Sequence, residues 1–376
     1  MEPLENPKFS RYFINPNGED SIFKFYKLAQ SSFWVEEEID SELKKDSIQW
    51  LTIDPKIQHL IINQIAFFLI GDGRVNQTIS EHICTNITDR EVLLWYNFQK
   101  MMEDIHNIVY VKLADTYVSG ANERRILFNT VENFPIIKNL IDWISKWLDE
   151  SNDIHKLNDD TIQDLNDLKI FYTDCHKLVS IFNPTLSTKF TNLFNKLNKP
   201  KPALAKQILV NIIVEGLLFQ GSFAIIFWFN HQYGKLPGLT KGNEFISRDE
   251  GMHTNFGILL YNNKIKYKES QATVHQMFTE AIDILIEHMD VGLNNGLLNM
   301  NINLMSTYLK YVADRLLCDL KYEKIYNVAN PFKFMEKQSV SIRMSDFFID
   351  HNVSEYGHFA SGTTCDDQEL CFDDAF

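Results

Sequence analysis

The sequence has few cysteines and no excess of basic residues, and each shortage excludes a class of protein. Its 376 residues include 5 cysteines, which are scattered and form neither a disulfide framework nor a paired Cys-x-x-Cys zinc site. This usage is typical of a reducing compartment, so we expect a cytoplasmic protein. With 36 Lys and Arg against 50 Asp and Glu, the formal charge is −14, which argues against a nucleic-acid-binding face.

Signals for export or membrane insertion are also lacking. Residues 1–13 contain no apolar stretch of the kind that marks a signal peptide. Residues 208–229 are long and apolar enough to cross a membrane, but the segment contains one carboxylate and three uncharged polar side chains: Glu215, Asn211, Gln220 and Ser222. A carboxylate near the centre of a bilayer is costly. We therefore expect no membrane span, and interpret this segment as the central helix of a soluble bundle.

Apolar side chains at helical spacing are abundant. Hydrophobic residues make up 45% of the chain, which is enough for a large core and excludes disorder over most of it. Asp54 and Pro55 begin one expected helix, and a capping box of Thr88 and Glu91 begins another that ends at Gly120. Further apolar-periodic runs cover residues 124–148 (with a kink at Pro135), 203–230, 244–263, 271–296 and 302–320. Alternating strands and internal repeats are lacking, so we expect an all-α fold.

The chain is expected to form one helical domain over residues 1–350, followed by a tail. Within the domain, the polar stretch 150–199 is predicted to be an insertion on the bundle surface. Residues 351–376 are small, polar and acidic, and little in them could offset the entropy lost on ordering, so we expect a flexible tail. Its last residues, 370–376, combine apolar and acidic side chains, as a peptide that docks in a partner's groove would.

Two Glu-x-x-His pairs carry the first chemical signal. Glu103 and His106 form one pair, and Glu250 and His253 form the other, on separate apolar helices. Residues three apart on a helix project from the same face, so each pair presents a carboxylate and an imidazole towards one point. A single pair of this kind is usually a solvated pair or a local hydrogen bond. Its occurrence on two core helices favours a shared metal site.

Two isolated acids complete a ligand set. Asp72 and Glu215 each interrupt an apolar helix, and a lone buried carboxylate is costly unless it is paired, hydrogen-bonded or metal-bound. Two Glu-x-x-His helices with one acid from each of two others are the ligands of a carboxylate-bridged two-metal site in a four-helix bundle. Four carboxylates balance two divalent ions. Mixed imidazole and carboxylate ligation suits iron or manganese, and the absence of thiolates argues against structural zinc.

Tyr110 is expected to lie beside this site, because it follows His106 by four residues on the same helix face. Phe219 and Phe223 lie four and eight residues after Glu215, and Ile246 lies four residues before Glu250. Such spacing is core packing by default. Here it would also allow these three side chains to wall an apolar pocket that shields an oxidised tyrosine from water and reductants.

These residues, with the sequence around them, resemble the small (beta) subunit of class I ribonucleotide reductases, of the eukaryotic and large-DNA-virus type. The resemblance covers nearly the whole chain, except that residues 150–199 exceed the family pattern by several dozen residues. It is carried by residues 29–38, 67–73, 102–106 with Tyr110, 214–216, 221–223, 236–240, 247–253, 330–332 and 372–376.

The resemblance implies a ferritin-like helical bundle that forms a homodimer and holds two iron ions, with manganese possible instead. Asp72 and His106 would be terminal ligands of one ion, and Glu215 and His253 of the other. Glu103 and Glu250 would bridge the two. The site would use dioxygen to generate a radical.

The resemblance also implies how the radical is stored and used. Tyr110 would hold it, and Trp34, Asp249 and His106 would relay the electron and proton. Tyr356 matches a mobile relay tyrosine in the tail, whose end would bind the large subunit, where ribonucleotides are reduced to deoxyribonucleotides. From local context alone, Trp34 is equally a core residue, and Asp249 beside Arg248 is equally half of a salt bridge.

Three other functions are weighed against this one. A different diiron oxidase of the same fold would not need Trp34, Tyr356 or a partner-binding tail. An iron-storage protein would usually be much shorter. A metal-free regulatory paralogue that only binds the large subunit would not need the intact set of six ligands.

Overall fold

The computed structural model describes residues 21–85, 87–118, 135–148, 204–293 and 302–332, together with positions 4, 14, 120, 124, 300, 334 and 335. All regular secondary structure in these ranges is helical, which confirms the all-α prediction. The predicted surface insertion at 150–199 and the predicted tail at 351–376 lie outside the described residues, so both remain predictions.

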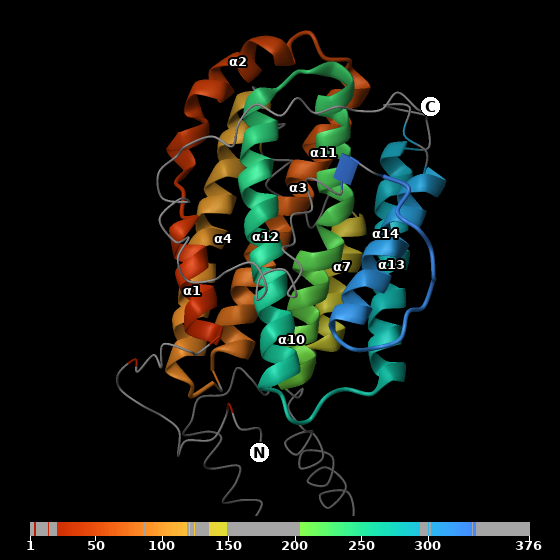
Figure 1. The fold of residues 1–376 in the computed structure, drawn as a ribbon. Coiled ribbons are helices and arrows are strands. Elements are labelled where there is room, and N and C mark those ends of the chain that lie inside the picture. The colour runs from red at the N-terminus through yellow and green to blue at the C-terminus, as the bar shows by residue number, and fades with distance from the viewer. Residues whose placement is uncertain are drawn as a thin grey trace, which may run out of the picture.

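Four long helical segments form the centre of the bundle (Figure 1). They are α3 (Pro55–Thr78), α4 (Arg90–Tyr117), α10 with α11 (Leu204–Ile213 and Gln220–Tyr233), and α12 (Pro237–Asn263). A π-helical turn at Val214–Leu218 joins α10 to α11, and another at Ile79–Ile83 follows α3. The apolar run predicted at 203–230 is therefore one helical stretch, Leu204–Tyr233, with a π turn inside it.

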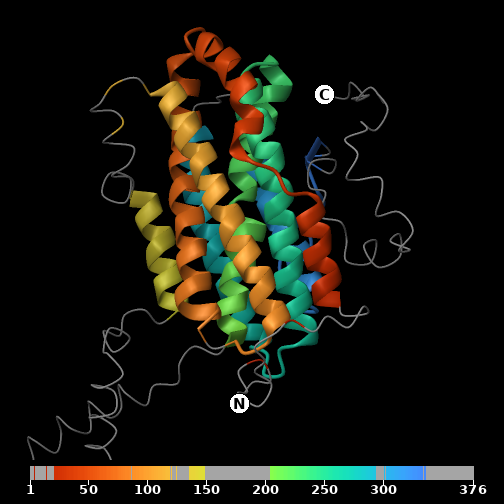
Figure 2. The same ribbon diagram turned by 90° about the vertical axis from the view of Figure 1, so that its left-hand side faces the viewer.

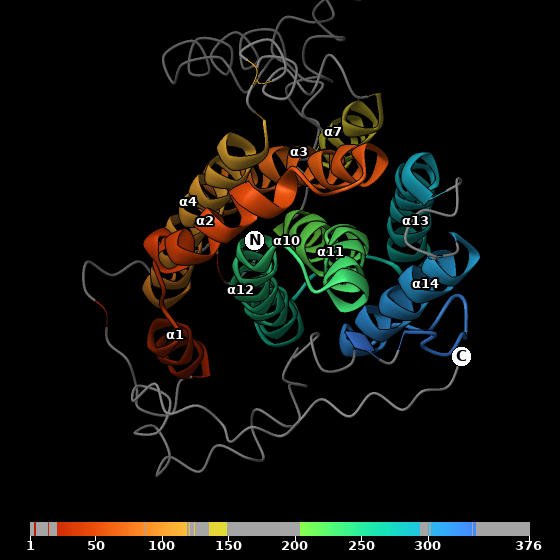
Figure 3. The same cartoon turned by 90° about the horizontal axis from the view of Figure 1, so that it is seen from above.

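Shorter helices surround this centre. They are α1 (Ser21–Ser31), a 3-10 turn at Glu36–Ile39, α2 (Asp40–Trp50), α7 (Pro135–Trp147), α13 (Gln271–Leu293) and α14 (Ile302–Asp319). Figure 2 shows α1 and α7 at opposite sides of the bundle. Viewed from above, α10 and α11 lie in the middle, between α3, α12, α13 and α14 (Figure 3).

The central position of α10 and α11 explains their apolar sequence. In the part of the chain that is described, Leu204–Tyr233 is the one helical stretch long and apolar enough to cross a membrane, and 94% of its most apolar window is buried inside the protein. Burial on all sides accounts for that hydropathy without a lipid environment. The stretch therefore has the character expected of a core helix.

Local caps fix two of the helix starts that bring the site together. Asp54 accepts a hydrogen bond from the backbone N–H of Lys56 at 2.8 Å, and Pro55 occupies the first turn, as predicted. The cap of α4 is Asp89, whose side chain accepts from the N–H groups of Glu91 and Val92, so the predicted Thr88 capping box is wrong by one residue. The helix also ends at Tyr117 rather than Gly120.

A tertiary contact sets the start of α12. The carboxylate of Asp46, from α2, accepts hydrogen bonds from the backbone N–H groups of Gly238 and Leu239 at 2.9 and 2.8 Å. These donors belong to the first turn, where N–H groups have no partner within the helix. The helix therefore begins at Pro237, seven residues before the predicted position 244. This early start brings Asn243 inside the helix.

Candidate metal centre

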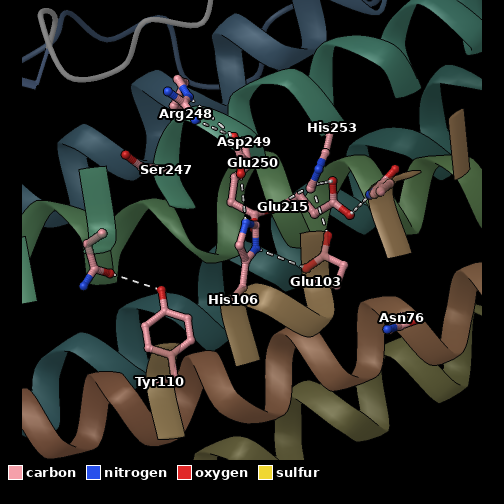
Figure 4. A network of polar contacts seen from close by, with 12 residues as sticks. Asn76, Glu103, His106, Tyr110, Glu215, Ser247, Arg248, Asp249, Glu250 and His253 are labelled. Carbon is pink, nitrogen blue, oxygen red and sulfur yellow. Dashed lines mark hydrogen bonds and ion pairs between the residues drawn. The ribbon is translucent and has the colours of Figure 1, made fainter. Parts of the chain in front are cut away.

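Six side chains from four helical segments converge in the bundle: Asp72, Glu103, His106, Glu215, Glu250 and His253. Figure 4 shows all of them except Asp72. They are buried, with exposures of 2% or less. The imidazole Nδ1 of His253 lies 3.0 Å from Glu103 Oε1 and 3.6 Å from Glu250 Oε2. The Nδ1 of His106 lies 3.1 Å from Glu250 Oε1 and 3.5 Å from Glu103 Oε2. Glu103 and Glu250 thus each contact both histidines, as the predicted bridging ligands would.

The donor atoms form two overlapping groups. One atom from each of Glu103, Glu215, Glu250 and His253 lies within 4.8 Å of the others, and the same holds for Asp72, Glu103 and His106. Glu103 belongs to both groups, whereas Asp72 belongs to one and Glu215 to the other. The structure therefore brings all six predicted ligand residues together, in two overlapping groups that could each hold a metal ion.

The hydrogen bonding of these residues tests whether cations fit. Both carboxylate oxygens of Asp72, Glu103 and Glu250 are buried without a hydrogen-bond partner, as are Oε2 of Glu215 and Nδ1 of both histidines. Buried polar atoms of this kind are rare in folded proteins, because losing hydration without a new partner is costly. Two divalent ions would satisfy these atoms and balance the four negative charges, so the donor set fits iron or manganese.

The pKa values of the clustered carboxylates are also strongly shifted. Burial raises the pKa of Asp72 well above its usual value, and the neighbouring charge of Glu103 adds to the effect. Burial likewise raises the pKa of Glu215. It opposes ionisation of Glu103 too, but the imidazoles of His106 and His253 outweigh it and lower the pKa of Glu103 to about 2. Such divergent values in one cluster are typical of functional sites.

The π-helical turn at Val214–Leu218 places Glu215 in the cluster. Single π turns within α-helices are rare and recur at functional sites. Close packing accompanies this one, because a Cβ at Gly216 would lie 2.6 Å from Cγ2 of Thr254 on α12. Only glycine allows α12 to approach so closely beside the ligand.

A hydrogen-bonded chain runs from the cluster to Trp34. The indole Nε1 of Trp34 donates to Oδ2 of Asp249 at 2.6 Å, and that oxygen lies 3.1 Å from Nε2 of His106. The other Asp249 oxygen lies 3.4 Å from a guanidinium nitrogen of Arg248. The salt bridge considered in the sequence therefore exists, but Asp249 also joins the indole to a ligand imidazole.

Tyr110 lies in an apolar pocket next to the cluster. It is fully buried, and its ring stacks on Phe68 with centroids 4.8 Å apart and planes 7° apart. Phe68 in turn packs against Phe219 and Phe223, at 5.4 and 4.8 Å. Ile246, the third predicted pocket residue, is fully buried on α12. Burial, followed by the charge of Asp72, raises the pKa of the Tyr110 phenol well above its usual value.

Two partners of Tyr110 were not expected from the sequence. Asn243 accepts a hydrogen bond from the phenol at 3.1 Å, and Phe68 provides the stacking surface. A signal for both existed in the spacing, because Phe68 lies one turn before Asp72 and Asn243 lies two turns before Glu250. Tyr356, the predicted relay tyrosine, lies outside the described residues.

Four carboxylates and two histidines held between the helices of one bundle define a protein of the ferritin-like, dimetal-carboxylate class. The sequence model of the ribonucleotide reductase small chain matches residues 11–331. The chain therefore belongs to the ribonucleotide reductase small-chain family.

Individual relatives agree with this assignment. The ribonucleoside-diphosphate reductase small chain of vaccinia virus (strain Copenhagen) is 34% identical over 95% of this chain and 94% of its own length. The corresponding chain of Spisula solidissima is 34% identical over 100% of this chain and 84% of its own. Among solved structures, a ribonucleotide reductase homodimer from Saccharomyces cerevisiae has a TM-score of 0.67 and 25% identity, covering 90% of each chain.

Proposed function

We propose that the chain is the radical-generating subunit of a ribonucleoside-diphosphate reductase, with two iron ions held by its six buried ligands and the radical on Tyr110. The proposal rests on the convergence of six buried side chains whose donor atoms lack hydrogen-bond partners. The buried phenol of Tyr110 lies one turn of α4 after one of them, His106. When bound, the two ions would supply, with dioxygen, the oxidising power that removes an electron from that phenol.

The surroundings of Tyr110 define what the protein does in this step. Burial raises the pKa of the phenol further above neutrality and disfavours any charged form of it. Loss of the electron therefore requires loss of the proton as well, and the reduction of dioxygen would consume that proton. Asn243 holds the hydroxyl at 3.1 Å in one orientation. The stacked ring of Phe68, backed by Phe219 and Phe223, excludes water and external reductants from the neutral radical.

Trp34 and Asp249 are proposed to carry the oxidising equivalent towards the partner subunit. An indole that loses an electron becomes strongly acidic, and the Asp249 carboxylate, 2.6 Å from Nε1, can accept the proton. The same carboxylate orients the imidazole of His106, as carboxylates beside metal-bound histidines do. One oxygen atom of Asp249 thus contacts both the indole of Trp34 and the imidazole of His106.

The remaining parts of the proposal concern metal and partners. Imidazole and carboxylate donors accept iron and manganese alike, so iron is proposed with manganese as the alternative. The tail, with Tyr356 and residues 372–376, is proposed to bind the large subunit. A cytoplasmic homodimer is proposed as the assembly, in line with the cysteine usage and with the homodimer of the Saccharomyces cerevisiae relative.

Metal uptake and reductase activity together test this function against its rivals. Metal-free protein is titrated with Fe(II) without oxygen, exposed to dioxygen, and then assayed with a large subunit for deoxyribonucleotide formation. Two ions per chain and reductase activity are expected. Uptake of two ions without activity would favour another diiron oxidase of this fold, and absence of uptake would favour a metal-free regulatory paralogue.

A further inference from the structure

We infer that Gln99 is a positioning residue, which holds the carboxylate of Glu215 so that one oxygen alone, Oε2, is presented to a metal ion. This inference rests on the dimetal site of the proposed function and adds residues outside its ligand set. It concerns Gln99 on α4, with Trp95 behind it and Asn211 on α10.

Two amide groups converge on the same oxygen of Glu215. The Nε2 of Gln99 donates to Oε1 at 2.7 Å, and the Nδ2 of Asn211 donates to Oε1 at 2.9 Å. The other oxygen, Oε2, is buried without a hydrogen-bond partner and lies 3.7 Å from Nδ1 of His253. The carboxylate is therefore divided into one oxygen occupied by the protein and one available to a cation.

Trp95 determines which way the Gln99 amide faces. An indole N–H can only donate, and Nε1 of Trp95 donates to Oε1 of Gln99 at 3.1 Å. The amide nitrogen must then point to Glu215. Trp95 is itself fully buried and stacks on Phe256 with centroids 4.3 Å apart. The orientation of Gln99 is thus fixed by a side chain that has no room to move.

The contrast with the bridging acids shows what this arrangement does. Glu103 and Glu250 have no hydrogen bond to either carboxylate oxygen, so both oxygens of each can bind ions and bridge them. Glu215 can offer only Oε2 unless it breaks two hydrogen bonds. Asp72, in the other donor group, also has no hydrogen bond to either oxygen. The two metal positions are consequently unequal, and Gln99 restrains the one on the Glu215 side.

The test compares Gln99→Leu with Gln64→Leu, a matched buried glutamine. Gln64 lies on α3, where its amide contacts Leu60 and Ser222 but none of the six ligands. Metal-free proteins are titrated anaerobically with Co(II), whose visible absorption weakens as its coordination number rises. In Gln99→Leu, one of the two binding steps is expected to weaken by about 10-fold or more. The absorption of that step should fall, because Oε1 of Glu215 then keeps only the hydrogen bond from Asn211 and can turn towards the ion more readily. Gln64→Leu should leave both steps unchanged.

Several results would overturn the inference. Two unchanged binding steps and an unchanged spectrum in Gln99→Leu would do so, and so would equal weakening of both steps in both variants. If Gln99→Leu does not fold, Asn211→Ala and Trp95→Phe decide, since each is expected to weaken the same single step and its absorption. Unchanged titrations of both would refute the positioning role. If the wild-type chain binds no pair of ions, the proposed function fails, and the inference fails with it.

Discussion

Trp34 and Asp249 are joined by a hydrogen bond of 2.6 Å, although 215 positions separate them in the sequence. The accepting oxygen, Oδ2, is also the one that faces the imidazole of His106 at 3.1 Å. The indole of Trp34 is nearly parallel to the His106 ring, with 18° between the planes. One buried carboxylate therefore couples the indole to the metal centre, and its charge is the feature that the relay depends on.

Asp249→Asn tests that charge. The substitution keeps the size of the side chain but removes the negative charge and the ability to accept a proton. Reductase activity is expected to fall by about 100-fold or more, as expected when a proton-transfer group is lost, while two metal ions still bind. Ser247→Ala, two residues away on α12, is the control. A normal rate of ribonucleotide reduction in Asp249→Asn would contradict the relay.

Gly71 and Gly73 of α3 make a matched pair for the radical pocket. A Cβ at Gly71 would lie 2.7 Å from Cζ of Phe219, whereas a Cβ at Gly73 would meet nothing within 4 Å. Gly71→Ala is expected to lower the free energy of unfolding by about 1–3 kcal/mol through overpacking. Displacement of Phe219 should also shorten the lifetime of the Tyr110 radical.

Gly73→Ala is the control, and it is expected to raise the free energy of unfolding by about 0.5–1 kcal/mol, because alanine is the better helix former. Denaturant unfolding and the decay of the radical signal measure the two effects. If both variants had the same stability and radical lifetime, the packing of Phe219 against α3 would not matter to the pocket.

His288 is expected to make the free energy of unfolding sensitive to acid. Its ring is buried against Phe67 with centroids 4.4 Å apart, and its Nε2 has no hydrogen-bond partner. Burial lowers the pKa of His288 from 6.5 to about 4. Below pH 6.5 the unfolded chain therefore takes up a proton that the folded chain refuses, so stability is lost as the pH falls towards 4.

The loss attributable to this one group is about 3 kcal/mol once the pH is below both pKa values. His288→Phe keeps a planar ring in contact with Phe67 and cannot titrate. The free energy of unfolding is measured on both metal-free proteins between pH 7 and pH 4. The decrease over this range should be smaller in His288→Phe than in the wild-type protein, by about the 3 kcal/mol attributed to His288. Parallel pH profiles of the two proteins would show that His288 is not held neutral.

Deletion of residues 369–376 tests the tail. These residues combine Phe372 and Phe376 with acidic side chains, and they are proposed to anchor the chain to the large subunit. The truncated protein should bind metal and form the radical normally but show no reductase activity. Binding to the large subunit, measured by surface plasmon resonance, should be lost. Unchanged affinity would remove the proposed role of the tail.

The sequence predicts which side chains converge in the core, because helical spacing alone decides which side chains share a face. Glu103 and His106 project together wherever α4 lies, and a lone acid such as Glu215 in an apolar helix needs a partner. The all-α class and the start of α3 at Pro55 also follow from local sequence rules. These features require no knowledge of how the helices pack.

Features that depend on packing were not predictable in this way. Asp46 caps α12 from α2, 192 positions away in the sequence, so the start of that helix is set by a tertiary contact. The π turn around Glu215 lies in a run that has the pattern of a continuous helix. Gln99 is a polar residue of ordinary appearance, and only the arrangement of helices shows that it faces Glu215.

The most direct test of the proposed function is electron paramagnetic resonance on metal-free protein supplied with Fe(II) and dioxygen, with Tyr110→Phe prepared in parallel. The wild-type chain should bind two iron ions and give a persistent organic radical signal. Tyr110→Phe should fold and bind the same amount of iron, but give no such signal. A persistent radical in Tyr110→Phe, or its absence from wild-type protein that holds two irons, would contradict the assignment of the radical to Tyr110.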